Sequence, residues 1–256
     1  MDRLTVQTRL GPLLVVGRLH AGRPRATLLA VGGAFPPADF LHDLVDKHPN
    51  DNVVVGNLPG MRTPSFDRHL PASFSAAFDE LIGALLPTQP IVAYGVSTGC
   101  LVTLGLRAPN VVRHVAQEPF FNTRDLWPFQ AYAQMKLTLN PDNELLADFL
   151  ASIFGIRLGG VDNVDYEQLA RGIRVPTDAI VAELPLMPER TLDTWPSLTS
   201  DHDRGLLRAN SMVRLHDAPK GTGHNIAVSA VGERFVHQVR VDALRAAALV
   251  RETDTA

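Results

Sequence analysis

The sequence predicts an α/β protein with a mostly parallel central sheet, helices on both faces and a helical cap inserted in it. Short, almost unbroken apolar runs, as at residues 26–31 and 91–96, are typical of strands buried on both faces of a parallel sheet. Segments with apolar residues at helical spacing, such as 71–86, alternate with these runs. The alternation stops at residue 122 and resumes near residue 177, which indicates an insertion.

The elements of the sheet domain follow in order along the chain. Residues 4–7 and 13–19 are predicted to form a hairpin, because Gly11-Pro12 between them is a turn signal. The later predicted strands are 26–31, 52–58, 91–96, 111–117, 177–182 and 211–216. The predicted helices are one with Phe40, Leu41, Leu44 and Val45 on one face, one at 71–86, one after Ser97 to about 107, one at 201–209 and one within 227–250.

The inserted segment is predicted to contain helices only. Asn140-Pro141-Asp142 and Gly159-Gly160 are the breaks between them. The three predicted helices are about 124–138, 142–154 and 164–172. We therefore expect a core domain formed by residues 1–121 and 174–256, with a helical cap at 122–173.

Composition excludes several classes of protein. The chain has 256 residues with a net charge of −3 and no basic run, which argues against a nucleic-acid surface. Its single cysteine, Cys100, allows no internal disulfide and is expected to be a small core residue. Neither a signal peptide nor a membrane-spanning apolar stretch is visible, so a cytoplasmic protein with a small-molecule partner is expected. The oligomeric state is not indicated.

The stretch from Ile91 to Cys100 carries the strongest chemical signal. An apolar strand enters the pentapeptide Gly95-Val96-Ser97-Thr98-Gly99, and a helical pattern follows it. Strand, sharp turn and helix is the context in which a Gly-x-Ser-x-Gly motif presents a serine nucleophile above a sheet edge. The alternative is a tight glycine turn with an incidental serine. The motif's context favours Ser97 as a nucleophile.

A serine nucleophile needs a base, and the best candidate is His224. It lies in the glycine-rich segment Lys220-Gly-Thr-Gly-His-Asn225, after the last predicted strand and before the last helix. A lone loop histidine is more often a solvent-facing residue, but this one follows the nucleophile in the order that the elbow architecture requires. If His224 is the base, Ser97 and His224 must lie next to each other above the same edge of the sheet, although they are far apart in the sequence.

The chain resembles the α/β-hydrolase superfamily over nearly its whole length. The matching segments are Gly32–Phe35, Leu58–Arg62, Gly95–Gly99 and Gly221–His224. Within the superfamily it looks somewhat like the thioesterases of biosynthetic pathways, although Gly32 stands where many members have histidine. The resemblance implies an oxyanion hole formed by the backbone N–H groups of Ala34 and Thr98.

The orienting acid is where the sequence departs from the superfamily. Its usual place, after the strand that ends near Ala182, reads Leu184-Pro185-Leu186-Met187 and offers no carboxylate. Glu118, at the end of the strand after the nucleophile helix, is favoured, since a branch of the haloalkane dehalogenases keeps its acid there. Those enzymes have aspartate and tryptophan where this chain has Ser97-Thr98, which argues against dehalogenation. The other candidates are Asp193 and, after it, Glu183, Asp201 and Asp203.

Apolar and aromatic residues around the cap predict a substrate pocket suited to an uncharged or acyl substrate. The pocket residues expected are Phe35, Phe121, Trp127 and Tyr132, although plain helix packing explains such residues equally well. No cofactor and no metal is expected. Asp201-His202-Asp203 is interpreted as an acidic helix N-terminus rather than a ligand set, and His42 and His48 as surface residues.

These features favour a serine hydrolase that cleaves a carboxylic ester or thioester through an acyl-enzyme on Ser97. Two alternatives remain open. One is a ligand-binding protein that kept the scaffold without hydrolysis. The other is a C–C hydrolase or lyase that uses the same serine.

Overall fold

The computed structural model describes residues 2–20, 26–34, 38–58, 69–184 and 196–253, except the side chains of 251–253. The strands of its main sheet are β1 (Asp2–Thr8), β2 (Gly11–Arg18), β3 (Thr27–Val31), β4 (Asn52–Gly56), β5 (Ile91–Val96), β6 (Val111–Gln117), β9 (Thr177–Val181) and β10 (Val213–Asp217). The helices around it are η1 (Ala38–Leu41), α1 (Leu44–Lys47), α2 (Pro71–Leu85), α3 (Thr98–Thr103), α7 (Asp201–Ala209), η2 (Ile226–Val228) and α8 (Ala230–Thr253).

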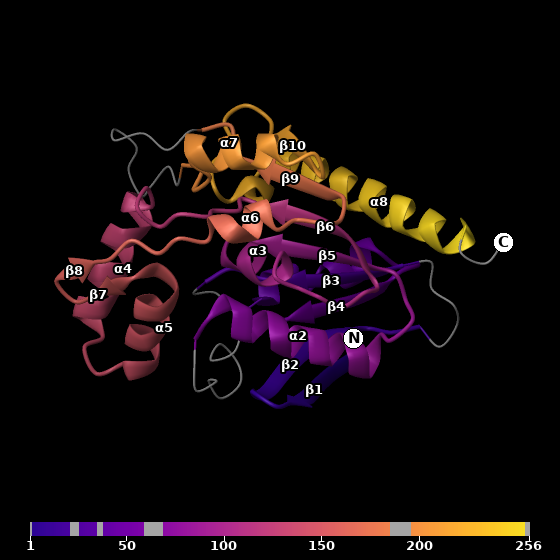
Figure 1. Ribbon diagram of the computed structural model, residues 1–256, viewed down its shortest axis with the longest axis horizontal. Helices are drawn as coiled ribbons and strands as arrows, with labels where there is room; N and C mark the ends of the chain where they lie inside the picture. Colours follow the sequence, from indigo (N-terminus) through magenta and orange to yellow (C-terminus); the bar gives the residue numbers. More distant parts are fainter. Residues whose placement is uncertain (1, 21–25, 35–37, 59–68, 185–195, 254–256) are drawn as a thin grey trace.

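The sheet is parallel apart from its first two strands, as predicted. The strands lie in the order β1-β2-β4-β3-β5-β6-β9-β10, and only the pairs β1–β2 and β2–β4 are antiparallel (Figure 1). Every residue of β3, β4, β5 and β9 is buried, which explains the unbroken apolar runs in the sequence. The parallel strands end at one edge of the sheet, where the predicted site residues follow β5 and β6.

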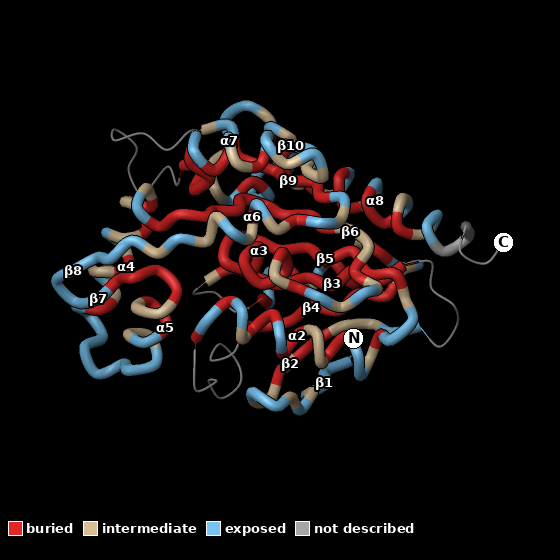
Figure 2. Tube along the Cα trace, in the orientation of Figure 1, coloured by how far each residue is buried: buried red, intermediate tan, exposed pale blue. Residues whose placement is uncertain are grey.

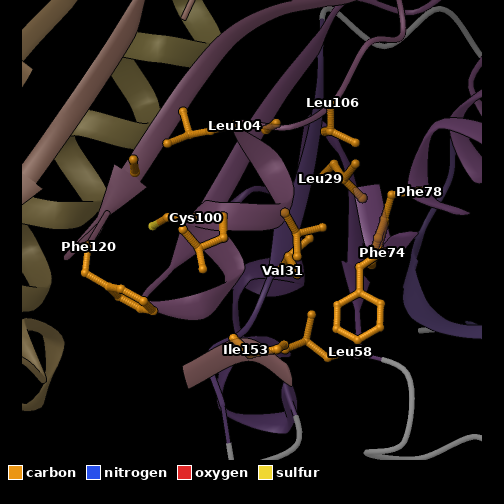
Figure 3. Packing of buried hydrophobic residues seen from close by; sticks show 14 of the residues in the cluster. Leu29, Val31, Leu58, Phe74, Phe78, Cys100, Leu104, Leu106, Phe120 and Ile153 are labelled. Atoms are coloured by element: carbon orange, nitrogen blue, oxygen red, sulfur yellow. The ribbon is translucent and has the colours of Figure 1, made fainter. Parts of the chain in front are cut away.

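Helices cover both faces of the sheet, and each face has its own hydrophobic cluster. Side chains alternate along β3, so Leu29 and Val31 pack in the cluster with α2 and α3, while Leu28 packs in the cluster with α1 and α8. Figure 3 shows the first cluster, with Phe74 of α2 and Cys100 of α3 close to Val31. Figure 2 shows the buried strands enclosed between more exposed helices.

The inserted segment contains α4 (Trp127–Leu139), α5 (Glu144–Phe154), β7 (Ile156–Arg157), β8 (Gly160–Val161) and α6 (Glu167–Arg171). In Figure 1, α4, α5, β7 and β8 lie together at one end of the molecule. The prediction of helices only is wrong at β7 and β8, which form a short antiparallel hairpin. Gly155, with φ 67°, ends α5 in the left-handed conformation, and Gly159, with φ 80°, lies in the turn between the two strands.

Several predicted details differ from the structure. The turn of the first hairpin is at residues 9–10, because Thr8 pairs with Gly11. The predicted helix around Phe40 is divided into η1 and α1, and Phe40 is half exposed rather than part of the buried face. His48 is buried rather than on the surface. Among the described helices, none has both the length and the apolar character needed to cross a bilayer.

Candidate active site

Ser97 lies at a strained turn between β5 and α3. Its backbone angles, φ 54° and ψ −120°, are rarely adopted by residues other than glycine. The flanking glycines are required by close contacts. A Cβ at Gly95 would lie 2.4 Å from Thr103 Oγ1, and a Cβ at Gly99 would lie 2.2 Å from the carbonyl oxygen of Val31. The pentapeptide thus forms the tight strand–turn–helix expected for a nucleophile elbow.

Glu118 occupies the position after β6 that Ser97 occupies after β5. The N–H of Ser97 donates to Gln117 O at 2.8 Å, and the N–H of Glu118 donates to Ile180 O at 2.8 Å. Each residue therefore adds one hydrogen bond to those that its strand forms with the next strand of the sheet. Glu118 also has a positive φ, 56°. Since β5 and β6 are neighbours, the two residues lie side by side at the same edge of the sheet.

The carboxylate of Glu118 is fully buried and held by donors on three sides. Oε1 accepts from the N–H of Ala182 at 2.6 Å and from Ser197 Oγ at 2.9 Å. Oε2 accepts from the N–H of Leu198 at 2.8 Å. A buried carboxylate needs such donors, because an unpaired charge in the interior is strongly destabilising. These bonds also fix the direction in which the carboxylate faces.

His224 completes the surroundings of this carboxylate. Its Nδ1 lies 3.1 Å from Glu118 Oε2. Because an ionised carboxylate only accepts hydrogen bonds, Nδ1 carries the proton in the neutral imidazole, and Nε2 is left as an acceptor. The loop that carries His224 is fixed by Thr222, whose carbonyl oxygen accepts from the N–H of Leu184 at 2.9 Å.

Ser97 and His224 line one cavity of about 430 Å³. Gly33 and Ala34 line it as well, and a Cβ at Gly33 would lie only 3.2 Å from Ser97 Cβ. The loop after β3 therefore lies directly against the nucleophile candidate, next to buried Thr98. The described residues contain no hydrogen bond between Ser97 and His224. Such bonds are often long before a substrate is bound.

The other acid candidates do not pair with His224 in the described part of the chain. Asp193 lies outside it. Glu183 accepts from the N–H of Gly221 at 3.1 Å near the surface, and Asp201 is exposed at the start of α7. Asp203 forms a capping box with Ser200 at the same helix end, and burial raises its pKa to about 6. Asp201 and Asp203 therefore belong to the helix N-terminus predicted for them.

Only some of the predicted pocket residues line the cavity in the structure. Tyr132 lines it, whereas Phe121 and Trp127 are absent from the described lining, and Phe35 lies outside the described residues. Phe121 is wholly buried beneath α7, where its N–H donates to Asp203. Phe129, another aromatic residue of the cap expected from the sequence to form an acyl pocket, also lines the cavity, whereas Phe40 and Tyr94 line it without having been predicted as pocket residues.

A further lining residue that sequence reasoning missed is Arg240 of α8. A signal for it exists in the sequence. The buried stripe of α8 comprises Val236, Val239, Arg240, Ala243, Leu244 and Ala247, so an arginine stands on the face of the helix that packs against the sheet. A charged residue at a core position is unusual unless it is paired or functional.

Comparison with known proteins gives structural matches only. No protein-family model matches the sequence, and no curated protein is a significant match. Carboxylesterase CesB from Bacillus subtilis has a TM-score of 0.67 at 15% identity, over 95% of this chain and 91% of that one. An esterase from Thermogutta terrifontis, bound to malate, has a TM-score of 0.65 at 13% identity, over 97% and 100%. MenH from S. aureus has a TM-score of 0.65 at 13% identity, over 91% and 98%. These likenesses confirm the predicted fold class.

Proposed function

We propose that this chain, which has the α/β-hydrolase fold, is a serine hydrolase that cleaves a carboxylic ester or thioester. The observation that carries the proposal is the pair of partly exposed His224 and fully buried Glu118, since His224 and Ser97 line the same cavity. An imidazole paired with a buried carboxylate and sharing a cavity with a serine at a strained turn is the arrangement that a serine nucleophile requires. Two of the structural neighbours are an esterase and a carboxylesterase, which agrees with this proposal.

In the first half of the proposed reaction, Ser97 Oγ attacks the acyl carbon and its proton moves to His224 Nε2. Glu118 keeps the ring in the tautomer that can accept this proton, and its charge stabilises the imidazolium. The oxyanion would accept hydrogen bonds from the N–H groups of Ala34 and Thr98. When the intermediate collapses, the alcohol or thiol leaves with the proton from His224.

In the second half, water attacks the acyl group on Ser97. His224 takes a proton from this water and returns one to Ser97 Oγ, so the acid leaves and the enzyme is restored. The residues at 122–173 would act as a cap that covers the acyl group. Tyr132 and Phe129 of α4 support this role, since both line the cavity.

The test is covalent labelling with a fluorophosphonate probe, combined with hydrolysis of 4-nitrophenyl esters. Labelling of the wild type and none of Ser97→Ala supports the proposal, provided that circular dichroism shows both to be folded. No labelling of folded wild type would favour a ligand-binding protein. Labelling without turnover of oxygen esters or thioesters would favour C–C hydrolase or lyase chemistry at the same serine.

A further inference from the structure

Gln117, the last residue of β6, lines the cavity directly beside the nucleophile candidate. It pairs with Val96, the residue before Ser97, and its backbone oxygen accepts from the N–H of Ser97 at 2.8 Å. Since side chains alternate along a strand, Gln117 faces the same side of the sheet as Val115, which belongs to the cluster with Tyr94. The residue is only 4% exposed. Its amide is therefore a polar group of the cavity wall and not of the outer surface.

The orientation of this amide is fixed by a chain of hydrogen bonds that runs in one direction. Arg240 Nη1 donates to the Tyr94 hydroxyl at 3.4 Å, and a guanidinium can only donate. Burial raises the pKa of Tyr94, so the hydroxyl keeps its proton and donates it to Gln117 Oε1 at 2.6 Å. The amide oxygen is thus bound to Tyr94, and the amide nitrogen Nε2 is left with two N–H donors.

Nε2 of Gln117 has no partner and can be reached by a ligand. No described residue accepts a hydrogen bond from it, yet it keeps accessible surface, unlike the enclosed and unpaired atoms Nε and Nη2 of Arg240. Because Gln117 is nearly buried and lines the cavity, the surface of Nε2 opens into that cavity. The described wall therefore offers a ligand a neutral, oriented donor next to Ser97.

This donor selects an uncharged oxygen that only accepts hydrogen bonds. A hydroxyl group would bring its own proton, and the amide oxygen that could accept it is already used by Tyr94. An anion would need a free cation, but Lys47 contacts both Asp43 and Glu233, the second at 2.7 Å. The Arg240 guanidinium lies 3.7 Å from Glu233, and its unpaired donors are enclosed. A carbonyl oxygen, which accepts and carries no proton, fits the site.

We propose that Gln117 donates a hydrogen bond from Nε2 to a second carbonyl oxygen of the substrate, so that the protein cleaves an ester or thioester whose acyl chain carries an uncharged keto group. This inference rests on the proposed hydrolase function and names its substrate class. A donor that loses its water to a plain methylene chain stays unpaired, which is costly, whereas a keto oxygen replaces that water.

The cavity wall places this carbonyl in the acyl half of the substrate. The wall is mainly apolar, with Leu41 and Leu44 among its members, and Lys47 of α1 is joined to Glu233 of α8 at 2.7 Å. This ion pair links the two helices that flank the cavity on this face. The alcohol or thiol must leave before water attacks, whereas the acyl chain stays, so the flanked part suits the acyl chain. Neighbouring strands lie about 4.8 Å apart, which puts the amide a few bonds from the acyl carbon on Ser97.

The activity test compares 4-nitrophenyl heptanoate with its 4-oxo, 5-oxo and 6-oxo derivatives. In wild type, kcat/KM for one of the keto esters should exceed that for heptanoate by about fivefold, a typical value for one neutral hydrogen bond. Gln117→Met should reduce this ratio to one or less, because methionine fills a similar volume without a donor. Tyr94→Phe should reduce it in part, since the amide loses the bond that orients it. The matched control is Gln238→Met on the exposed side of α8, which should keep the wild-type ratio.

A second variant, Gln117→Glu, guards against a Gln117→Met protein that does not fold. It keeps an oxygen for the Tyr94 hydroxyl and replaces the donor with an acceptor, so it should also lose the keto preference. Circular dichroism checks the fold of both variants. A keto preference that persists in either folded variant would overturn the inference, and so would a wild type that favours none of the three keto esters.

A binding test separates this inference from the proposed chemistry. In calorimetry, Ser97→Ala should bind at least one of the three methyl oxoheptanoates about fivefold more tightly than methyl heptanoate. The double variant with Gln117→Met should lose that difference. Equal binding of all four methyl esters to Ser97→Ala would overturn the inference. Failure of fluorophosphonate labelling would overturn the hydrolase proposal alone, since the binding test does not depend on turnover.

Discussion

Ser97 and Glu118 stand one residue beyond the ends of neighbouring parallel strands, and both have left-handed backbone angles, φ 54° and φ 56°. Both residues thus leave the sheet with a positive φ at the same edge, on neighbouring strands. Backbone strain of this kind costs on the order of 1–3 kcal/mol per residue and persists where the surrounding structure enforces it. Here hydrogen bonds from both residues to the adjacent strand enforce it.

Glu118→Gln is expected to lower kcat by roughly 10²- to 10⁴-fold, because a glutamine amide can hold the imidazole in the wrong tautomer and cannot balance its charge. The measurement is kcat for 4-nitrophenyl ester hydrolysis, with circular dichroism to check the fold. Asp193→Asn is the control and should lose less than about threefold. A large loss in the control together with an active Glu118→Gln would assign the acid to Asp193 instead.

Gly99→Ala is expected to destabilise the fold by roughly 2–4 kcal/mol, because its Cβ would meet the carbonyl oxygen of Val31 at 2.2 Å. Gly83→Ala on α2 is the matched control. A Cβ there meets nothing within 4 Å, so the substitution should leave stability unchanged or raise it by up to about 1 kcal/mol. Urea unfolding of the two variants measures both values. Equal stability of the pair would contradict the packing described at the turn.

Phe154→Ala is expected to cost about 3–5 kcal/mol of unfolding free energy. Phe154 ends α5 and is buried, with its ring centroid 4.3 Å from that of Phe129 and 5.7 Å from that of Phe120, which follows β6. The inserted segment is thereby packed on the sheet domain. Leu139→Ala, on the exposed end of α4, should change stability by less than about 0.5 kcal/mol. A Phe154→Ala variant as stable as this control would show that the contact contributes little.

His114 is expected to make the protein less stable in mild acid. Burial lowers its pKa to about 4, so between pH 6.5 and 4 the unfolded chain binds a proton that the folded one does not. The stability contribution is therefore lost as pH falls, by about 2 kcal/mol between pH 7.5 and pH 5. His114→Gln should show a smaller loss of urea stability over this interval than wild type.

Comparing the wild type with His114→Gln cancels the contributions of other groups that titrate in the same pH range. Burial also lowers the pKa of His48 to about 4, which acts in the same direction. The raised pKa of Asp203, about 6, acts in the opposite direction, because its folded carboxyl binds a proton first. Both effects are common to wild type and His114→Gln. The exposed His20→Gln is the control, and a His114→Gln curve parallel to the wild type would refute the expectation.

The fold could be predicted from the sequence because burial on both faces leaves a local signal. The apolar runs of β3, β4, β5 and β9 are wholly buried strands, and α7 spans the predicted residues 201–209. Where a helix is short and held by loops, periodicity fails. The residues around Phe40 have helical spacing, yet the backbone changes from η1 to α1 and Phe40 turns towards solvent at the cavity.

The site was only partly predictable, because strand register and helix packing are not local properties. Ser97 and His224 could be named as candidates from the motif and from their order along the chain. The pairing of Glu118 with His224 depends on which strand lies beside β5, which the sequence does not state. Arg240 could not be assigned to the cavity, since its contact with Tyr94 joins α8 to β5, which only the three-dimensional structure brings together.

The position of Glu118 directly after β6 determines which segments hold the proposed acid. The N–H groups of Ala182 and Leu198 both donate to Glu118, and the N–H of Ser197 donates to Leu184 O at 2.7 Å. These bonds join the two stems of the stretch 185–195 at its base, while no proposed reacting group is carried on the stretch itself. All the donors that hold the Glu118 carboxylate thus come from residues outside that stretch, so its sequence does not enter the hydrogen bonds that orient the proposed acid.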